Sequence, residues 1–261
     1  MLNKTKVTLS CQIDKILTEL HLNTIKASWQ ESLNKSLKDE FSPEKWFLSL
    51  LETEQYCRYN SKIQRLIKQS RLPLEKSLNS YDLKRLPIAL KSQLESLKEG
   101  HFVKDKANVL CFGNPGSGKT HLMCALALHL AQEGFKVSYH SCAILVQELL
   151  AAKKQLSLPK LVKQLMKNDI LVLDEMGYLE QDRAEMEVFF TLLSECYETT
   201  SILLTSNLPF SQWDRIFKDK MITAAAIDRL IHHSVILELN LPSYRMETAK
   251  TKKEALEKKS T

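Results

Sequence analysis

The stretch VLCFGNPGSGKTHLMCAL, residues 109–126, decides how the rest of the sequence is interpreted. An apolar run typical of a buried strand leads into eight residues that match G-x-x-x-x-G-K-[ST] at every position, and a helical pattern follows. In this context backbone amides and a helix N-terminus surround phosphate oxygens, whereas a glycine-rich turn without a ligand would not need the complete motif. Lys119 would neutralise the β- and γ-phosphates, and the Thr120 hydroxyl would bind Mg²⁺. The predicted nucleotide contacts are Gly113, Asn114, Pro115, Gly116, Ser117, Gly118, Lys119 and Thr120, with His121 either a further contact or a packed side chain.

Two acids follow the apolar run in DILVLDEMG, residues 169–177. At the carboxyl end of a buried strand, Asp174 can reach Mg²⁺ through water, and Glu175 can orient and polarise the attacking water. Adjacent acids after a strand also occur in solvated turns. Because a complete phosphate loop lies upstream, the pair favours ATP hydrolysis over nucleotide binding alone.

A third apolar run, SILLTSNLPF at residues 201–210, ends in polar residues that include Asn207. If this strand lies beside the strands of the loop and the acid pair, Asn207 comes close to the γ-phosphate and can hydrogen-bond the attacking water. The alternative is an asparagine in the turn before Pro209. The order of loop, acid pair and polar strand end favours the sensor role.

The apolar pattern changes along the chain. Residues 1–99 contain no glycine and show helical spacing, with Ser42 at an N-cap and Pro43 at the first helical position. From residue 108 onward, short apolar runs alternate with amphipathic stretches, which predicts an α/β fold with a parallel sheet. The predicted strands are NVLCF, KVSYH, DILVLD, SILLTSN and SVILEL. We expect a helical domain that binds DNA or a partner (1–70), linker helices (71–106), an ATPase domain (107–245) and a basic, disordered tail (246–261).

Composition and charge narrow the class of protein. The 261 residues are 44% hydrophobic, which supplies an ordinary core, and no segment approaches the about 20 apolar residues of a membrane span or resembles a signal peptide. We therefore expect a cytoplasmic protein without a membrane partner.

Six scattered cysteines without a C-x-x-C pair predict reduced thiols. Residues 1–106 carry 19 Lys and Arg against 13 Asp and Glu, while the remaining residues have no net charge. Such a positive excess is typical either of a segment that binds a polyanion or of an ordinary solvated surface.

Taken in this order, the motifs resemble those of the AAA+ ATPases, and more narrowly those of the IstB-like ATP-binding proteins of insertion-sequence transposons, relatives of the DnaC-type helicase loaders. The resemblance rests on FGNPGSGKTHL, LVLDEMGYL, LLTSNLPFSQWDRIF, AAIDRLIHHS and SYR, and it covers roughly residues 65–245. It implies an AAA+ P-loop core with a five-stranded parallel sheet, preceded by a small helical domain and followed by little or no C-terminal lid.

The resemblance also implies roles for single residues. Two arginines join the set: Arg229 is similar to the finger that such proteins insert into a neighbouring subunit's site, and Arg245 to the second sensor, which touches the γ-phosphate of its own chain. A site completed by a neighbour implies a homo-oligomer. From the residues alone, Arg229 could instead lie on a solvated helix face or pair with Asp228. The implied positions are Lys119 and Thr120 for the phosphates, Asp174 for magnesium, Glu175 as catalytic base and Asn207 as first sensor.

Two basic stretches are candidates for DNA contact. The first has helical spacing and could track a phosphate backbone or form a solvated face. The second is divided by Pro159 into two short helices, and the resemblance implies a helical insertion there that lines the DNA-facing side of an assembled ring or spiral. Neither carries a sequence-reading motif, so we expect contacts mainly to phosphates. The residues are Arg58, Lys62, Arg65 and Lys68 in the first stretch and Lys153, Lys154, Lys160, Lys163 and Lys167 in the second.

Several functions fit these motifs. The first is an ATP-dependent, DNA-binding ATPase that assembles on duplex target DNA and assists a transposase; its transposition part comes from the resemblance. A helicase loader acting on single strands shares the fold. A nucleotide-gated adaptor with negligible hydrolysis would need neither Glu175 nor Asn207. A small-molecule kinase would need an acceptor site, and the sequence shows none.

Overall fold

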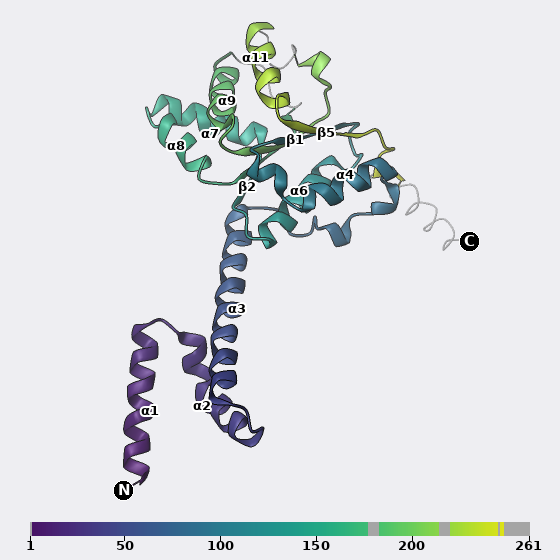
Figure 1. The fold of residues 1–261 in the computed structure, drawn as a ribbon. Coiled ribbons are helices and arrows are strands. Elements are labelled where there is room, and N and C mark those ends of the chain that lie inside the picture. The colour runs from purple at the N-terminus through teal and green to yellow at the C-terminus, as the bar shows by residue number, and fades with distance from the viewer. Residues whose placement is uncertain (1, 177–182, 214–219, 245, 248–261) are drawn as a thin grey trace, which may run out of the picture. The chain divides into compact units, whose positions relative to one another are not determined.

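The computed structural model describes residues 2–176, 183–213, 220–244, 246 and 247 (Figure 1). The chain divides into two compact units, Met1–Gln64 and Arg65–Thr261. The division falls inside helix α3 (Pro43–Ser70), and residues 71–106 belong to the same unit as the sheet. The expected domain bounds stay predictions. Within the described ranges, no helix has both the length and the hydrophobicity needed to span a membrane.

Helices α1 (Leu2–Glu19), α2 (Asn23–Lys38) and the first part of α3 build the first unit. α3 begins as predicted, with Pro43 as its first residue and the Ser42 hydroxyl accepting a hydrogen bond from the Lys45 backbone N–H at 3.3 Å. The small core of this unit consists of Ile25, Trp29 and Leu50, with Leu17, Leu22, Leu33 and Trp46 packed around them.

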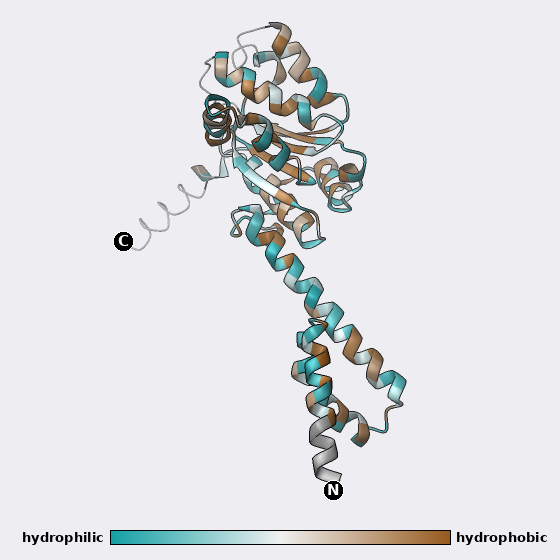
Figure 2. Cartoon of the chain, turned by 90° about the vertical axis from the view of Figure 1, so that its left-hand side faces the viewer, coloured by the Kyte–Doolittle hydropathy of each residue, from teal (hydrophilic) through white to brown (hydrophobic). Residues whose placement is uncertain are grey.

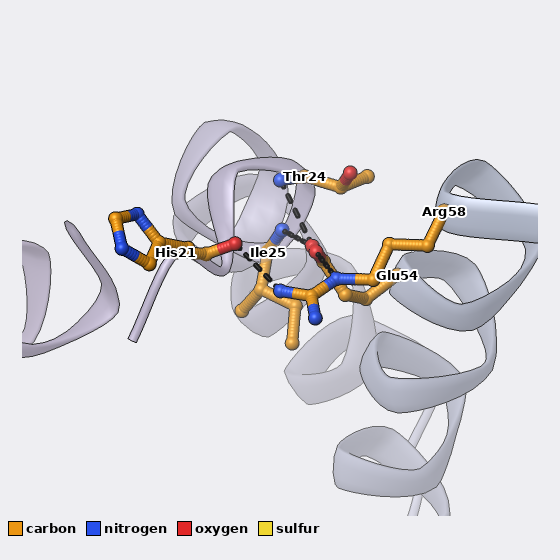
Figure 3. A network of polar contacts seen from close by, with 5 residues as sticks. All are labelled: His21, Thr24, Ile25, Glu54 and Arg58. Carbon is orange, nitrogen blue, oxygen red and sulfur yellow. Dashed lines mark hydrogen bonds and ion pairs between the residues drawn. The ribbon is translucent and has the colours of Figure 1, made fainter. Parts of the chain in front are cut away.

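A buried carboxylate joins α2 to α3 in this unit (Figure 3). Glu54 is 6% exposed and accepts hydrogen bonds from the backbone N–H groups of Thr24 (2.9 Å) and Ile25 (3.1 Å). Backbone N–H groups in the first turn of a helix have no acceptor within the helix itself, and Glu54 supplies one. Arg58 donates to Glu54 at 2.7 Å and to the His21 carbonyl oxygen at 2.6 Å. Burial disfavours the charged carboxylate, but these hydrogen bonds outweigh it and hold the pKa of Glu54 below its ordinary value.

A five-stranded parallel sheet forms the centre of the second unit, in the order β2-β3-β4-β1-β5. Every residue of β3 and β4 is buried, because helices cover both faces of the sheet. All five predicted strands are confirmed: β1 (Asn108–Gly113), β2 (Val137–Ser141), β3 (Ile170–Asp174), β4 (Ser201–Ser206) and β5 (Ser234–Leu239).

Helices lie on both faces of the sheet (Figure 1). Alternate strand residues pack against opposite helical layers. Leu171 and Leu173 face the first layer, whereas Ile170 and Val172 face the second. Figure 2 shows brown, hydrophobic segments in the interior of this unit. The first layer contains α7 (Cys142–Lys154), α8 (Leu158–Leu165), α9 (Arg183–Cys196) and α11 (Lys220–Ile231); the second contains α4 (Ile88–Lys98), α5 (His101–Lys104) and α6 (Lys119–Gln132).

Several local predictions are also confirmed. Pro159 lies in the first turn of α8 and separates it from α7, because proline is favoured at a helix start and cannot continue a preceding helix. All six cysteines are free, and burial raises the pKa of Cys111 and Cys124 to about 12, which keeps these thiols protonated.

The sheet order brings the predicted motifs together. In a parallel sheet all strands end at one edge, and β1, β4 and β3 are neighbours. The phosphate loop follows β1, Asp174 ends β3 and Asn207 follows β4. The three motifs therefore meet at the carboxyl edge of the sheet.

Candidate active site

Two glycines of the loop after β1 could not carry a side chain without overlap or backbone strain. A Cβ atom on Gly113 would overlap the Leu239 carbonyl oxygen of β5. Gly118 has φ 100°, a backbone conformation that glycine tolerates without strain, and it is the N-cap of α6. The first turn of α6 therefore presents its amide groups to the loop, as a phosphate site requires.

Lys119 is held at the mouth of this loop. Its ammonium group donates hydrogen bonds to the carbonyl oxygens of Gly113 (2.8 Å) and Asn114 (2.9 Å). Both acceptors belong to the loop itself, so the positive charge lies where phosphate oxygens would enter. The phosphate-binding role of Lys119 stays a prediction, with which this position is compatible.

Asp174 is the centre of a hydroxyl network. Its carboxylate is 3% exposed and accepts hydrogen bonds from Thr120 (2.8 Å), Thr205 (2.5 Å) and Tyr139 (2.9 Å). The three donors come from α6, β4 and β2. Burial and the neighbouring Asp174 raise the pKa of Tyr139, so its phenol stays protonated and can donate. This network fixes the carboxylate beside the Thr120 hydroxyl.

Glu175 lies next to this network in a strained conformation. Its φ is 63°, in the left-handed region, which costs a residue with a side chain about 1–3 kcal/mol. The Thr205 hydroxyl accepts a hydrogen bond from the Glu175 backbone N–H at 2.8 Å and stabilises this turn. The Glu175 side chain is exposed and lines the pocket above the loop. Thr205 therefore connects both acids.

Asn207 lines the same pocket as Lys119, Thr120 and Glu175. Its Oδ1 atom is buried and has no hydrogen-bond partner among the described residues. A buried polar atom normally has a partner, so this amide is available to a group inside the pocket. The structure thus brings together the loop, the acid pair and the predicted first sensor.

A wall of the pocket comes from a segment that no motif in the sequence connects to the loop. Tyr81 lies over Gly118, and a Cβ atom on that glycine would come within 3.2 Å of the Tyr81 hydroxyl oxygen. Burial raises the pKa of Tyr81 to about 12, so it is neutral. Sequence reasoning missed this wall, because residues 71–106 show only the pattern of linker helices. Its other lining residues are Lys76, Ser80, Asp82 and Arg85.

His121 anchors this wall. Its Nε2 atom lies 3.1 Å from the Ser80 hydroxyl and 3.2 Å from the Ser77 carbonyl oxygen, and its ring meets Tyr81 edge-on at 5.1 Å. Burial lowers the pKa of His121. Of the two roles considered for this residue, packing is the one these contacts show, although the side chain also lines the pocket.

The segment after β5 returns to the phosphate loop. The Tyr244 backbone N–H donates to the Gly116 carbonyl oxygen at 3.0 Å. Arg85 donates to the Pro242 carbonyl oxygen (2.7 Å) and pairs with Glu247 (2.8 Å). The predicted second sensor, Arg245, lies outside the described residues, as does most of the expected tail, and both stay predictions.

Arg229 is away from the pocket of its own chain. Its guanidinium group packs over the Phe190 ring at 4.9 Å and donates to the Ala225 carbonyl oxygen at 3.1 Å. It is absent from the described residues that line the pocket. This position is compatible with action on a neighbouring subunit.

The two basic stretches differ in how many of their charged side chains already form hydrogen bonds or ion pairs within the chain. Arg58 is held by Glu54 and the His21 carbonyl, which gives it a structural role, whereas Lys62, Arg65 and Lys68 are exposed on α3. Lys153 pairs with Glu187 at 3.0 Å. Exposed side chains in the second stretch are Lys154, Lys160, Lys163 and Lys167, and α8 ends at Leu165, before the last of them.

Solved structures share the fold of the second unit. A crystal structure of DnaI superimposes with a TM-score of 0.54, 22% identity and coverage of 64% of this chain and 94% of that one. AMPPCP-bound DnaA from Aquifex aeolicus also gives 0.54, with 20% identity, over 71% of this chain and 56% of that one. The similarity confirms the AAA+ fold.

Sequence relatives cover both units. A proposed insertion-sequence ATP-binding protein of Sinorhizobium fredii is 36% identical over 90% of this chain and 79% of its own length. A proposed ATP-binding protein of insertion sequence IS21 from Pseudomonas aeruginosa is 33% identical over 90% and 89%. The profile of the family described as IstB-like ATP binding protein matches residues 15–255, well beyond the 65–245 expected from the motifs. The chain therefore belongs to the IstB-like ATP-binding protein family.

Proposed function

We propose that the chain hydrolyses ATP, with Lys119, Asp174, Glu175 and Asn207 at the reacting phosphate. The observation that carries the proposal is the position of Glu175, an exposed carboxylate in one pocket with Asn207 and beside the buried Asp174 network. The Asn207 Oδ1 atom has no partner among the described residues and is available to a ligand. A site that only binds nucleotide needs neither Glu175 nor Asn207. Family membership supports ATP binding.

Thr120 and Asp174 fit a Mg²⁺ ion, because a hydroxyl and a carboxylate oxygen converge at 2.8 Å beside the loop. When bound, Mg²⁺ supplies positive charge that neutralises phosphate oxygens. Thr205 and Tyr139 keep the carboxylate oriented. Lys119 brings its ammonium charge to the phosphates, Glu175 accepts a hydrogen bond from the attacking water and aligns it, and the Asn207 amide holds that water from the neighbouring strand end.

Substitution of Glu175 tests this role. Glu175→Gln keeps the shape of the side chain and removes its basic carboxylate, so we expect turnover to fall by about 10²–10⁴ while ATP binding is retained. Glu195→Gln, at an exposed acid of α9, is the matched control and should leave turnover unchanged. ATPase rates and nucleotide affinities measured on both variants test the catalytic role of Glu175. Normal turnover in Glu175→Gln would exclude this residue from the mechanism.

We further infer that ATP drives assembly of subunits on duplex DNA in the cytoplasm and that the assembly assists a transposase. Three observations support this proposal: the basic excess of residues 1–106, the exposed lysines around α8 and the insertion-sequence origin of the relatives. Arg229 would complete a neighbour's site, and such an arginine can be worth ~10³–10⁵ in rate. Hydrolysis would then depend on assembly.

Gel-shift assays with a non-hydrolysable ATP analogue test DNA binding. We expect duplex DNA to be preferred over single strands and expect a triple variant, Lys160→Ala, Lys163→Ala and Lys167→Ala, to bind more weakly. The slope of log affinity against log salt should become shallower by about 0.9 for each phosphate that the variant no longer neutralises. Lys104→Ala, at an exposed lysine that ends α5, is the control. Preference for single strands would instead favour a helicase loader.

A further inference from the structure

A second cluster of chemically reactive side chains lies at the opposite edge of the sheet from the nucleotide pocket. Glu198 lies in the turn between α9 and β4, and His232 and His233 lie between α11 and β5, so all three precede the amino ends of strands. The three side chains are exposed, and one ligand atom from each lies within 4.8 Å of the others. In the ranges that the structure describes, no second group of His, Cys, Asp or Glu meets this distance.

We propose that Glu198, His232 and His233 bind a divalent transition-metal ion, for which Zn²⁺ is the best match. Two imidazole nitrogens and one carboxylate oxygen form a three-ligand set typical of zinc, with the fourth position left to water. Mg²⁺ prefers all-oxygen ligands and keeps its own water. The site is therefore chemically distinct from Thr120 and Asp174.

The backbone that carries these ligands is held in place by Asn108, a buried residue at the start of β1. Its backbone N–H donates to the His233 carbonyl oxygen at 2.7 Å, and its side-chain amide donates to the Leu230 carbonyl oxygen at 3.1 Å. Its Oδ1 atom accepts from the Ile202 backbone N–H at 2.9 Å. One side chain thus fixes the loop after α11 relative to the start of β4, a few residues from Glu198.

The histidines are oriented for binding. The Nδ1 atom of His232 lies 2.9 Å from the Tyr197 hydroxyl, which leaves Nε2 to bind the ion. A ligating histidine usually donates a hydrogen bond from its second ring nitrogen, and the Tyr197 hydroxyl oxygen can accept one from Nδ1 of His232. The rings of His232 and His233 have centroids 4.2 Å apart.

Zinc binding requires the three ligand atoms to come closer together than they are in the structure. Ligand atoms of a tetrahedral zinc site are about 3.3 Å apart, given bonds of about 2.0–2.1 Å. The present atoms lie within 4.8 Å of one another, and because all three side chains are exposed, we expect rotation about their side-chain bonds to bring them to that distance.

An ion at this position would connect two functional elements. It would tie the end of α11, which carries Arg229, to the turn before β4, the strand that leads to Asn207. Because the ion would bind only the folded chain, a hundredfold excess over the dissociation constant should raise the thermal midpoint by about 5–10 °C.

Titration of the full chain, prepared without a histidine tag, tests the proposal. Zn²⁺ is added in the presence of millimolar Mg²⁺ and ATP analogue, which occupy the nucleotide site, and a chromophoric chelator reports free zinc. We expect one Zn²⁺ per chain and expect the His232→Ala/His233→Ala double variant to lose at least about 100-fold in affinity. His101→Ala is the matched control, since His101 is an exposed histidine 3.4 Å from Glu99 and in the described structure belongs to no three-ligand group.

Two further variants distinguish coordination of Zn²⁺ by these side chains from non-specific electrostatic attraction of the ion. Tyr197→Phe removes the hydroxyl that contacts His232 and also hydrogen-bonds Glu198, and it should weaken binding by about 10–100-fold. Glu198→Gln removes the charged ligand and should also weaken binding. Equal zinc affinity in the wild type and the double variant, or no stoichiometric binding to the wild type, would overturn the proposal.

Discussion

Thr205 offers a test of the active site at a residue to which the sequence motifs assigned no role. Its side chain is 1% exposed, and its hydroxyl donates to Asp174 at 2.5 Å and accepts from the Glu175 backbone N–H at 2.8 Å. Thr205→Val keeps the size of the side chain and removes both hydrogen bonds. A bond to a charged group contributes about 1.5–3 kcal/mol and a neutral bond about 0.5–1.5 kcal/mol, so we expect the free energy of unfolding to fall by about 2–4.5 kcal/mol.

The same substitution should reduce catalysis. The left-handed turn at Glu175 loses the acceptor that stabilises it, and a loss of about 1.4–2.7 kcal/mol in transition-state stabilisation lowers kcat by about 10–100-fold. ATPase rates at saturating ATP and denaturant unfolding are measured on each variant. Thr205→Ser keeps the hydroxyl and should retain most of both quantities.

Thr200→Val provides a matched control. Thr200 is as deeply buried as Thr205, but its hydroxyl has no hydrogen-bond partner among the described residues. Removal of that hydroxyl should therefore leave stability and turnover near wild type. If Thr205→Val behaves like Thr200→Val, the connection through Thr205 is refuted.

Three further predictions rest on individual contacts. Tyr139→Phe removes a hydrogen bond to Asp174 and should raise the Mg²⁺ concentration needed for half-maximal turnover by about 3–10-fold; an unchanged requirement would contradict the orienting role. Glu54→Gln should destabilise the first unit by about 1–3 kcal/mol in thermal unfolding, whereas Glu52→Gln, at an exposed position, should not. Because the folded pKa of Glu54 is lowered, its stabilisation is present above the ordinary Glu pKa of about 4.3 and is lost as pH falls through the folded value, which unfolding at pH 3 to 6 would reveal. Arg229→Ala should preserve ATP binding and make turnover insensitive to DNA, so retained DNA stimulation would exclude the finger role.

The sheet and the catalytic motifs could be predicted because their signals are local. Each buried strand is a short apolar run, and the glycines around Lys119 meet steric requirements that few other residues satisfy. Parallel order then placed Asp174 and Asn207 at one edge. Thr205 and Tyr139 escaped notice because a hydroxyl on a strand carries no signal of what it contacts on the next strand.

Other features depend on tertiary placement. Tyr81 and Arg85 precede the phosphate loop by about as many residues as a β-α-β unit contains (~30). No rule based on sequence spacing relates residues that far apart to the loop. The helical spacing of Arg58 is confirmed, but spacing cannot show that Glu54 and His21 already engage its charge. The boundary between the units falls inside α3, where an unbroken helix hides it from the sequence.

The most direct test of the central claim is the ATPase rate per subunit, measured across protein concentration with and without duplex DNA. A site completed by a neighbour's Arg229 predicts a rate per subunit that rises with concentration and rises further with duplex DNA. In Glu175→Gln the rate should be lower by about 10²–10⁴ under every condition. A rate per subunit that is independent of both concentration and DNA would contradict the account, because it would show that each chain hydrolyses ATP alone.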